Sequence, residues 1–311
     1  MQKTKYLRIS VTEQCNLSCF FCHNEGNVEK RTLLSTDDIV FVCSIAKKLG
    51  FVKFKLTGGE PTLREDIYEL INKLSQLNLA DLSMITNGTT LESHAPSLLN
   101  AGLRRLNVTL NTLDEKRHKK INPNNYIPIE NIIRGIDAAL RVGFTNMKIN
   151  FIYIDEQSDN DLDELLNFVV QRSLTLVLLP LLPSSHCAVT TDLCALYARM
   201  AKYGLSSERN EKDTEGIQKT YLKLKNGTEV LLRKDELASC KPYIFCAECS
   251  KKEFCKEGIF PLRLSAYGSL IPCLANNHNQ LVLETAIRNR DEDTIIAAIK
   301  KIWDWQIDDK D

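Results

Sequence analysis

The sequence has no excess of charge, because its 40 lysines and arginines balance 40 aspartates and glutamates. A neutral chain has no overall attraction for polymeric nucleic acid or for an anionic membrane. The sequence also lacks a long apolar run, since SLTLVLLPLL at 173–182 contains a proline and is too short to span a bilayer. The first ten residues, MQKTKYLRIS, lack the apolar segment of a secretory signal. We therefore expect a cytoplasmic protein with neither membrane nor nucleic-acid partners.

Cysteine, by contrast, occurs at eleven positions. In a chain that is not exported the thiols should be mostly reduced, which favours metal ligation over disulfides. Cys15, Cys19 and Cys22 follow an alternating run in a C-x3-C-x2-C spacing. A structural zinc site is closed by four ligands, and a common iron–sulfur cluster is usually held by four cysteines. Three cysteines would therefore leave one iron of a four-iron cluster open to a ligand from outside the protein.

Strand-like and helix-like segments alternate through the first two thirds of the chain. Apolar runs of strand length predict strands at 6–12, 52–57, 82–86, 105–111, 147–154 and 174–181. Helical patterns fill the gaps, at 36–50, 63–77, 91–101, 129–142 and 161–172. This alternation predicts an α/β fold with a parallel sheet. Six units are too few for a closed eight-stranded barrel, so we expect an open, partial (βα)6 TIM-like barrel.

The pattern changes near residue 205. A charged stretch, SSERNEKDTEG, is followed by hairpin-like sequence in which cysteine, glycine and proline recur. We therefore expect a domain boundary at this point. The partial barrel would cover residues 1–205, and a small C-terminal domain with an auxiliary cluster would cover residues 206–311.

Two motifs follow successive predicted strands. Gly58-Gly59-Glu60-Pro61 comes after the second strand, and Ile85-Thr86-Asn87-Gly88 comes after the third. Barrel enzymes keep their chemistry at the carboxyl ends of the strands, and glycine there lets the backbone approach a ligand closely. The cysteine triplet and these two motifs, in this order, resemble the radical S-adenosylmethionine (SAM) enzymes.

The resemblance implies both a cofactor and its chemistry. In that family the open iron of a [4Fe-4S] cluster is chelated by the amino and carboxylate groups of SAM. One electron from the cluster then breaks a carbon–sulfur bond and gives a 5′-deoxyadenosyl radical. The resemblance implies that the cysteine triplet holds the cluster and that the GGEP segment holds the methionyl amine. It places these residues at the cofactor: Phe21, Gly58, Gly59, Glu60, Pro61, Thr86, Asn87, Thr109 and Leu182. For Thr109, an ordinary β-branched strand residue is a nearly equal interpretation.

A second set of cysteines lies near the C-terminus. The resemblance implies an auxiliary [4Fe-4S] cluster held by Cys246, Cys249, Cys255 and Cys273, and a zinc ribbon is the alternative. With Cys255 as a ligand, this cluster would have no open iron for substrate. If Cys255 is a free thiol, substrate ligation stays possible. Cys240 is a weaker candidate ligand.

Along most of its length the chain also resembles the GTP 3′,8-cyclase family of molybdenum-cofactor synthesis. The matching segments are YLRISVTEQCN, KLTGGEPTLRED, LNVTLNTLD, VGFTNMKIN and LRLSAYGSLIPCL. Carried over by position, the resemblance implies four substrate-binding cations, namely Arg8, Lys55, Lys148 and Arg263. On the plainer interpretation, each is a solvated charge at a strand end. No residue of the chain itself is identified as catalytic.

Departures from the cyclase pattern indicate another substrate. Lys55 and Val177 stand where that family has arginines, Ile85 replaces a threonine, and the chain ends DWQIDDKD without a glycine pair. The first hypothesis is therefore a tailoring radical SAM enzyme on a small molecule or nucleotide, served by an electron donor such as flavodoxin or ferredoxin. The second is a divergent GTP cyclase, and the third is a non-catalytic iron–sulfur or zinc protein.

Overall fold

The computed structural model describes residues 5–22, 32–155, 157–180, 200–212, 218–233, 246–249, 262–274 and 279–305. Six parallel strands form its centre. They are β1 Lys5–Ser10, β2 Phe51–Thr57, β3 Asp81–Thr86, β4 Arg105–Thr109, β5 Asn146–Tyr153 and β6 Thr175–Pro180. The helices between them are α1 Thr36–Lys48, η2 Pro61–Leu63, α2 Ile67–Ser75, α3 Leu91–Asn100, α4 Glu115–Ile121, α5 Ile129–Arg141 and α6 Ser158–Arg172.

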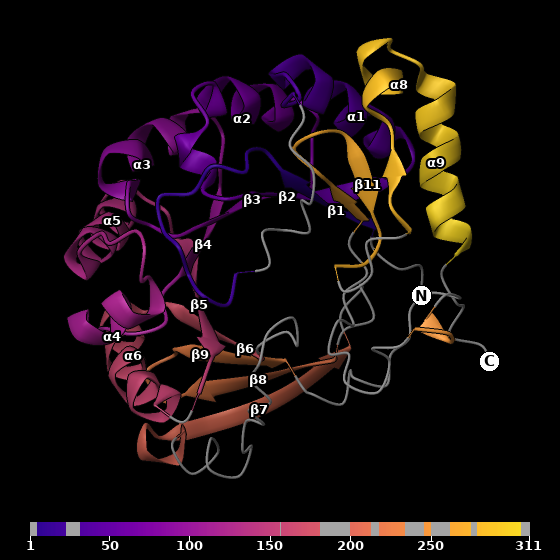
Figure 1. The fold of residues 1–311 in the computed structure, drawn as a ribbon. Coiled ribbons are helices and arrows are strands. Elements are labelled where there is room, and N and C mark those ends of the chain that lie inside the picture. The colour runs from indigo at the N-terminus through magenta and orange to yellow at the C-terminus, as the bar shows by residue number, and fades with distance from the viewer. Residues whose placement is uncertain are drawn as a thin grey trace.

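The strands curve into an arc, and helices cover its outer side (Figure 1). The helices contribute apolar stripes to this outer layer, for example Ile39, Val42 and Ala46 of α1. Leu7 and Ile9 of β1 belong to the same buried cluster. This arrangement confirms the α/β class and the partial TIM-like barrel expected from the sequence.

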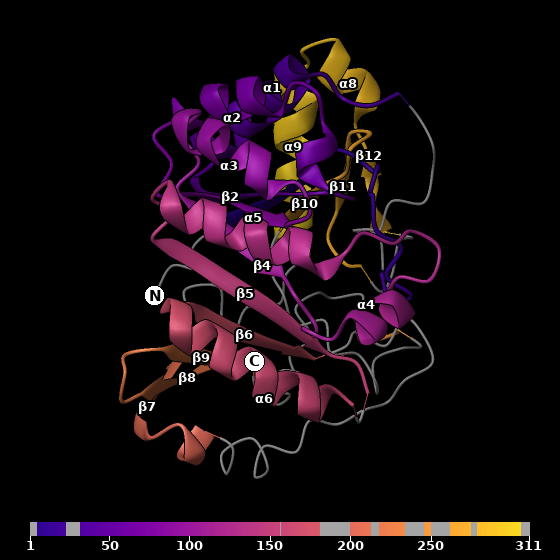
Figure 2. The same ribbon diagram turned by 90° about the vertical axis from the view of Figure 1, so that its left-hand side faces the viewer.

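Later segments extend both edges of this sheet. On one side β10 Leu262–Leu264 pairs in parallel with β1, followed by β11 Ser269–Ile271 and β12 Leu281–Val282. On the other side β9 Glu229–Arg233 pairs in parallel with β6, followed by β8 Gln218–Leu224 and β7 Leu205–Lys212. Figure 2 shows β7, β8 and β9 beyond β6. The C-terminal part of the chain therefore lines both edges of the arc.

The last two helices, α8 Glu284–Arg288 and α9 Glu292–Asp304, lie beside α1 (Figure 1). Trp303 packs edge-on against Phe51, with ring centroids 5.8 Å apart. The Lys5 ammonium lies 4.7 Å from the Trp303 ring centroid. These contacts cover the amino-terminal ends of β1 and β2, opposite the ends at which the sequence motifs lie.

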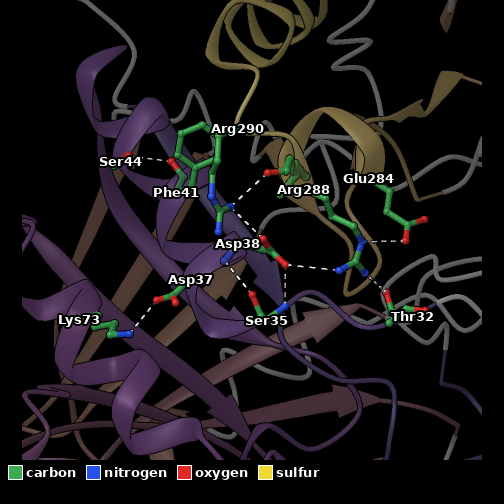
Figure 3. A network of polar contacts seen from close by, with 11 residues as sticks. Thr32, Ser35, Asp37, Asp38, Phe41, Ser44, Lys73, Glu284, Arg288 and Arg290 are labelled. Atoms are coloured by element: carbon green, nitrogen blue, oxygen red, sulfur yellow. Dashed lines mark hydrogen bonds and ion pairs between the residues drawn. The ribbon is translucent and has the colours of Figure 1, made fainter.

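A polar network connects α8 and the turn after it to the start of α1 (Figure 3). Ser35 and Asp38 form a capping box, in which each side chain accepts from the other residue's backbone N–H. Arg290 donates to the Asp38 carboxylate at 2.8 Å, and Arg288 lies 3.7 Å from it. Burial opposes ionisation of Asp38, but the hydrogen bonds from Ser35 and the charge of Arg290 outweigh it and lower the pKa of this carboxyl.

Among the residues that the structure describes, none of the helices combines the length and the hydrophobicity of a membrane span.

Candidate active site at the carboxyl ends of the strands

The cysteine loop begins where β1 stops pairing with β2. The Val11 N–H still bonds to the Thr57 carbonyl at 2.9 Å, and the Thr12 hydroxyl accepts from the Gln14 N–H at 3.1 Å. The chain then turns away from the sheet. Cys15 and Cys22 are exposed, and Cys19 is half-buried.

The region after α4 holds the other side of this loop. The Phe20 N–H donates to the Ile121 carbonyl at 3.1 Å. The Ser18 hydroxyl accepts from the backbone N–H groups of Asn124 and Asn125 at 3.0 and 2.9 Å. Phe21 is 8% exposed and packs with Ile121 and Ile154, away from the main core. The loop is thus anchored to a segment about 100 residues later in the chain.

The three thiols of the loop lie close enough to influence one another. Burial, together with the charges of Cys22 and Cys15, raises the pKa of Cys19 to about 12. The pKa of Cys15 is also raised, chiefly because the surrounding protein partly shields this exposed residue's thiol from water, and the charges of Glu60 and Cys22 act in the same direction. Three thiolates placed this close repel one another unless a cation lies among them. Only the thiolate form binds metal, so a bound metal would hold all three groups in that form. This donor set fits an iron–sulfur cluster.

A single metal ion fits less well. In the residues that the structure describes, no three cysteine, histidine or acidic side chains converge on one point where an ion could bind. A four-iron cluster is larger than an ion, and each of its irons takes a separate thiolate. Its ligands are therefore spread around it.

The GGEP segment runs directly beside the start of the cysteine loop. The Gly59 N–H donates to the Thr12 carbonyl at 2.8 Å, and the Glu60 N–H donates to the Gln14 carbonyl at 2.7 Å. A Cβ on Gly58, whose φ is +150°, would lie 2.3 Å from the Thr12 carbonyl oxygen. A Cβ on Gly59 would lie 2.2 Å from the Gln14 carbonyl oxygen. Only glycine fits this contact between the two motifs.

Glu60 joins the GGEP segment to the end of β3. Its side chain is fully buried, and Oε1 accepts from the hydroxyls of Thr62 and Thr86 at 2.6 and 2.7 Å. Oε2 accepts from the Asn87 N–H at 2.7 Å. Burial raises the pKa of Glu60, and these hydrogen bonds oppose that shift. Pro61 starts the short helix η2 next to this carboxylate.

Asn87 connects β3 to the cysteine loop. Its side-chain NH2 donates to Asn16 Oδ1 at 2.8 Å and lies 3.8 Å from Cys15 Sγ. Its Oδ1 accepts from the Thr89 hydroxyl at 2.7 Å, while Asn16 Nδ2 donates to that same hydroxyl at 2.8 Å. The cysteine loop, the GGEP segment and the segment Ile85–Gly88 therefore form one hydrogen-bonded assembly.

Cations form a row across the inner face of the sheet. Arg8 is level with Arg263 of β10 on one side and with Lys55 of β2 on the other. All three lie on the strand face opposite to Leu7 and Ile9. Arg263 is 2% exposed, and its Nη1 donates to the Pro272 carbonyl at 3.3 Å.

Lys148 lies apart from this row. It is on β5, level with Asn107 and Thr175, so β3 and β4 separate it from Lys55. The Lys55 ammonium lies 5.3 Å from the Tyr6 ring centroid. The structure therefore groups three of the four predicted substrate cations.

The remaining predicted residues are less closely placed. Thr109 is half-buried at the end of β4, level with Asn150 of β5. Cys246 and Cys249 share a turn in which the Cys249 N–H donates to the Cys246 carbonyl at 3.2 Å. Cys273 is buried just after β11. Leu182, Cys240 and Cys255 lie outside the described residues, so the auxiliary cluster stays a prediction.

Sequence reasoning missed several residues of the assembly. The Cys19 thiol lies 3.0 Å from Asn122 Oδ1, and Asn122 is almost completely buried. The Tyr267 hydroxyl donates to Glu13 at 2.5 Å and so connects the turn before β11 to the cysteine loop. Asn16 and Thr89 stand within or beside the recognised motifs, and this proximity is a signal that could have identified them. Tyr267 lies within LRLSAYGSLIPCL, a segment already matched to the cyclase family, whereas Asn122 gave no such signal.

Comparison with known proteins identifies the class. Residues 9–169 match the family described as the radical SAM superfamily, and the chain belongs to that superfamily. It is a radical SAM enzyme, and it uses the SAM and the [4Fe-4S] cluster on which that superfamily depends. The resemblance inferred from the motifs is thereby confirmed.

Within the superfamily the chain is similar to proteins named probable GTP 3′,8-cyclase. The one from Methanothermobacter thermautotrophicus is 31% identical over 92% of this chain and 89% of its own length. The one from Archaeoglobus fulgidus is 32% identical over 87% of this chain and 86% of its own length. The chain is thus similar to these probable cyclases along almost its whole length.

Solved structures share the fold. Streptococcus suis SuiB bound to S-adenosylmethionine superposes with a TM-score of 0.64 at 19% identity, covering 95% of this chain and 64% of SuiB. The chain therefore spans slightly less than two thirds of SuiB. The structure of anSMEcpe with bound AdoMet gives a TM-score of 0.59 at 16% identity, covering 87% of this chain and 74% of that one.

Proposed function

We propose that this radical SAM enzyme abstracts hydrogen from a phosphate-bearing small molecule, a nucleotide or a compound like it. The observation that carries the proposal is the row formed by Arg263, Arg8 and Lys55 on three adjacent strands. Cations on the inner face of a barrel attract an anionic ligand, and arginine binds phosphate through two parallel N–H donors.

The residues at the strand ends have distinct roles in this proposal. Cys15, Cys19 and Cys22 hold the cluster, and the GGEP segment with Glu60 holds SAM beside it. When bound, the cluster and SAM supply a 5′-deoxyadenosyl radical by one-electron cleavage of a carbon–sulfur bond. Glu60 Oε2 receives one described hydrogen bond, from the Asn87 N–H. A carboxylate oxygen has room for a second donor, and the SAM ammonium group would be that donor.

Substrate binding is tested with pairs of phosphorylated and unphosphorylated nucleosides. Reconstituted enzyme with SAM and dithionite should form 5′-deoxyadenosine above the substrate-free level only with a phosphorylated compound. Equal stimulation by the unphosphorylated partner would contradict the proposal.

Arg8→Ala should then weaken binding of the active compound. Loss of a charge-assisted hydrogen bond costs roughly 1.5 to 3 kcal/mol, which is about one to two decades in KM. The value of kcat should change less, because ground-state and transition-state binding are lost together. Arg141→Ala is the matched control, since Arg141 is exposed at the end of α5.

A divergent GTP 3′,8-cyclase is the second candidate, favoured by the near full-length similarity to proteins of that name. Two features oppose it. Val177 is apolar and buried on β6, where the cyclase pattern has an arginine, and Lys55 lacks the fork of an arginine. We expect weak GTP binding and little cyclisation. Robust formation of the 3′,8-cyclised nucleotide, detected by mass, would make the cyclase the leading assignment.

We further propose that residues 206–311 form a C-terminal extension with an auxiliary [4Fe-4S] cluster. Cys246, Cys249 and Cys273 are its ligands, with Cys255 as the fourth. Support comes from the short Cys246–Cys249 turn and from Cys273 directly after β11, the strand two places from β1. Bound zinc in place of iron at this site would overturn the proposal. The third hypothesis, a non-catalytic metal protein, is not retained, because the family is one of enzymes.

A further inference from the structure

An exposed basic and aromatic surface adjoins the cysteine loop, and we name it the α4 face. It consists of Phe20, Tyr126, Lys116, Lys119 and Lys120. Phe20 is 51% exposed and Tyr126 is 44% exposed. Within the described part of the chain they are two of four large hydrophobic residues that are exposed. The three lysines are exposed too. They share one side of α4, because their spacing is three and four residues.

The α4 face adjoins the cysteine loop at Phe20 and Cys19. The Phe20 backbone N–H bonds to the last residue of α4, Ile121, at 3.1 Å. Asn122, the next residue, lies 3.0 Å from the Cys19 thiol through its Oδ1. The Lys119 ammonium is 5.6 Å from the Tyr126 ring centroid. Phe20 is thus joined to the end of α4 beside Cys19, Tyr126 lies against Lys119, and Figure 2 shows α4 at the rim of the barrel.

The other charged residues at α4 form hydrogen bonds or ion pairs with neighbouring groups. Asp114 caps the helix by accepting from the Arg117 N–H at 2.6 Å. Glu115 accepts from the Tyr126 hydroxyl and from the Ile129 N–H. Arg117 is turned toward Asp155 and Asp161, with which it forms ion pairs. The exposed charge of the α4 face is consequently positive.

We propose that the α4 face is the docking surface for an acidic, one-electron carrier protein. Reductive cleavage of SAM takes one electron, which must reach the cluster from outside the chain. The reduced carrier loses one electron, the cluster gains it, and no proton or other group is transferred. Lysines at the rim of an interface steer an acidic partner into place, and aromatic residues supply the contact area at its centre. This inference rests on SAM cleavage and is independent of the proposed substrate.

Charge reversal tests the proposal. The triple variant Lys116→Glu, Lys119→Glu, Lys120→Glu is compared with Lys202→Glu, Lys223→Glu, Lys225→Glu, which reverses three exposed lysines elsewhere. The probe is a purified acidic flavodoxin, and its Kd for the reconstituted enzyme is measured by calorimetry at low and high salt. We expect the α4 variant to bind at least tenfold more weakly and the control to bind as the wild type does. Equal loss in both variants, or no loss in the α4 variant, would overturn the proposal.

Two further measurements separate docking from damage to the site. SAM cleavage driven by dithionite, a small reductant that needs no docking surface, should be unchanged in the α4 variant, while cleavage driven by reduced flavodoxin should fall at least tenfold. If the α4 variant also loses SAM cleavage with dithionite, its site is damaged, and the test then rests on the wild type alone. Its affinity for flavodoxin must weaken as salt rises, because the attraction is electrostatic, and an affinity independent of salt contradicts the proposal.

Discussion

Replacing Gly59 with alanine would put a methyl group where the backbone of the cysteine loop already lies. The new Cβ would be 2.2 Å from the Gln14 carbonyl oxygen and 2.5 Å from the Glu13 carbonyl oxygen. Both are backbone atoms, so no side chain can turn aside to make room. The GGEP segment or the cysteine loop must therefore move.

The magnitude follows from what that movement breaks. Overpacking of this kind costs roughly 1 to 3 kcal/mol. The two backbone hydrogen bonds between the segments, from Gly59 and Glu60, contribute about 0.5 to 1.5 kcal/mol each. We expect the free energy of unfolding to fall by about 2 to 6 kcal/mol. Because Glu60 moves with the segment, the affinity for SAM should fall at least tenfold.

Urea unfolding and equilibrium dialysis with SAM measure the two effects separately. Gly227→Ala is the control, because Gly227 has a φ of +90° but no atom within 4 Å of the position that a methyl group would take. That variant should lose about 1 to 2 kcal/mol from the left-handed backbone alone and keep its affinity for SAM. Wild-type stability and SAM affinity in Gly59→Ala would refute the contact that we describe.

Three further predictions concern a hydrogen bond, an ion pair and a metal count. Thr86→Val removes a donor that lowers the pKa of Glu60. The pKa of Glu60 should rise further, and the acid limb of SAM binding should move to higher pH in a calorimetric titration. Asp38→Asn should cost about 1 to 2 kcal/mol at pH 7, because the amide keeps only one of the two acceptor oxygens that bind Ser35 and Arg290 and has no charge. Because folding lowers the pKa of Asp38, its carboxylate stabilises the fold at pH values above the unfolded pKa of about 3.9. This contribution is lost as the pH falls through the lower pKa of the folded state. The difference in free energy of unfolding between wild type and variant, measured with urea, should therefore shrink toward pH 3. Wild-type protein should hold about eight irons and the double variant Cys246→Ala, Cys249→Ala about four, and eight irons in that variant would contradict the ligand assignment.

The central strands were predictable from sequence because their neighbours in the sheet are also their neighbours in the chain. The strand predicted at 52–57 is observed as Phe51–Thr57, where polar and apolar residues alternate until Gly58. The helix predicted to start at Thr36 does so, since Ser35 and Asp38 supply a capping box that is visible in the sequence.

Long-range contacts were not predictable. Helix α4, EKRHKKI, buries only His118 and Ile121, so it carries no apolar stripe. The bond between Cys19 and Asn122 joins residues 103 apart. The pairing of β10 with β1 likewise brings Arg263 level with Arg8, although most of the chain separates the two residues in sequence. Local patterns contain no information on such pairs, because they form only when the arc of strands is assembled.

Formation of 5′-deoxyadenosine by purified protein tests the central claim most directly. The wild type is reconstituted without oxygen, mixed with SAM and dithionite, and compared with Cys15→Ala, Cys19→Ala and Cys22→Ala. The loop that carries these residues is anchored on both sides by contacts outside it, so each variant should fold but lose the cluster. The account predicts 5′-deoxyadenosine from the wild type and none from any of the variants. Full production by Cys19→Ala, or none by an iron-loaded wild type, would contradict it.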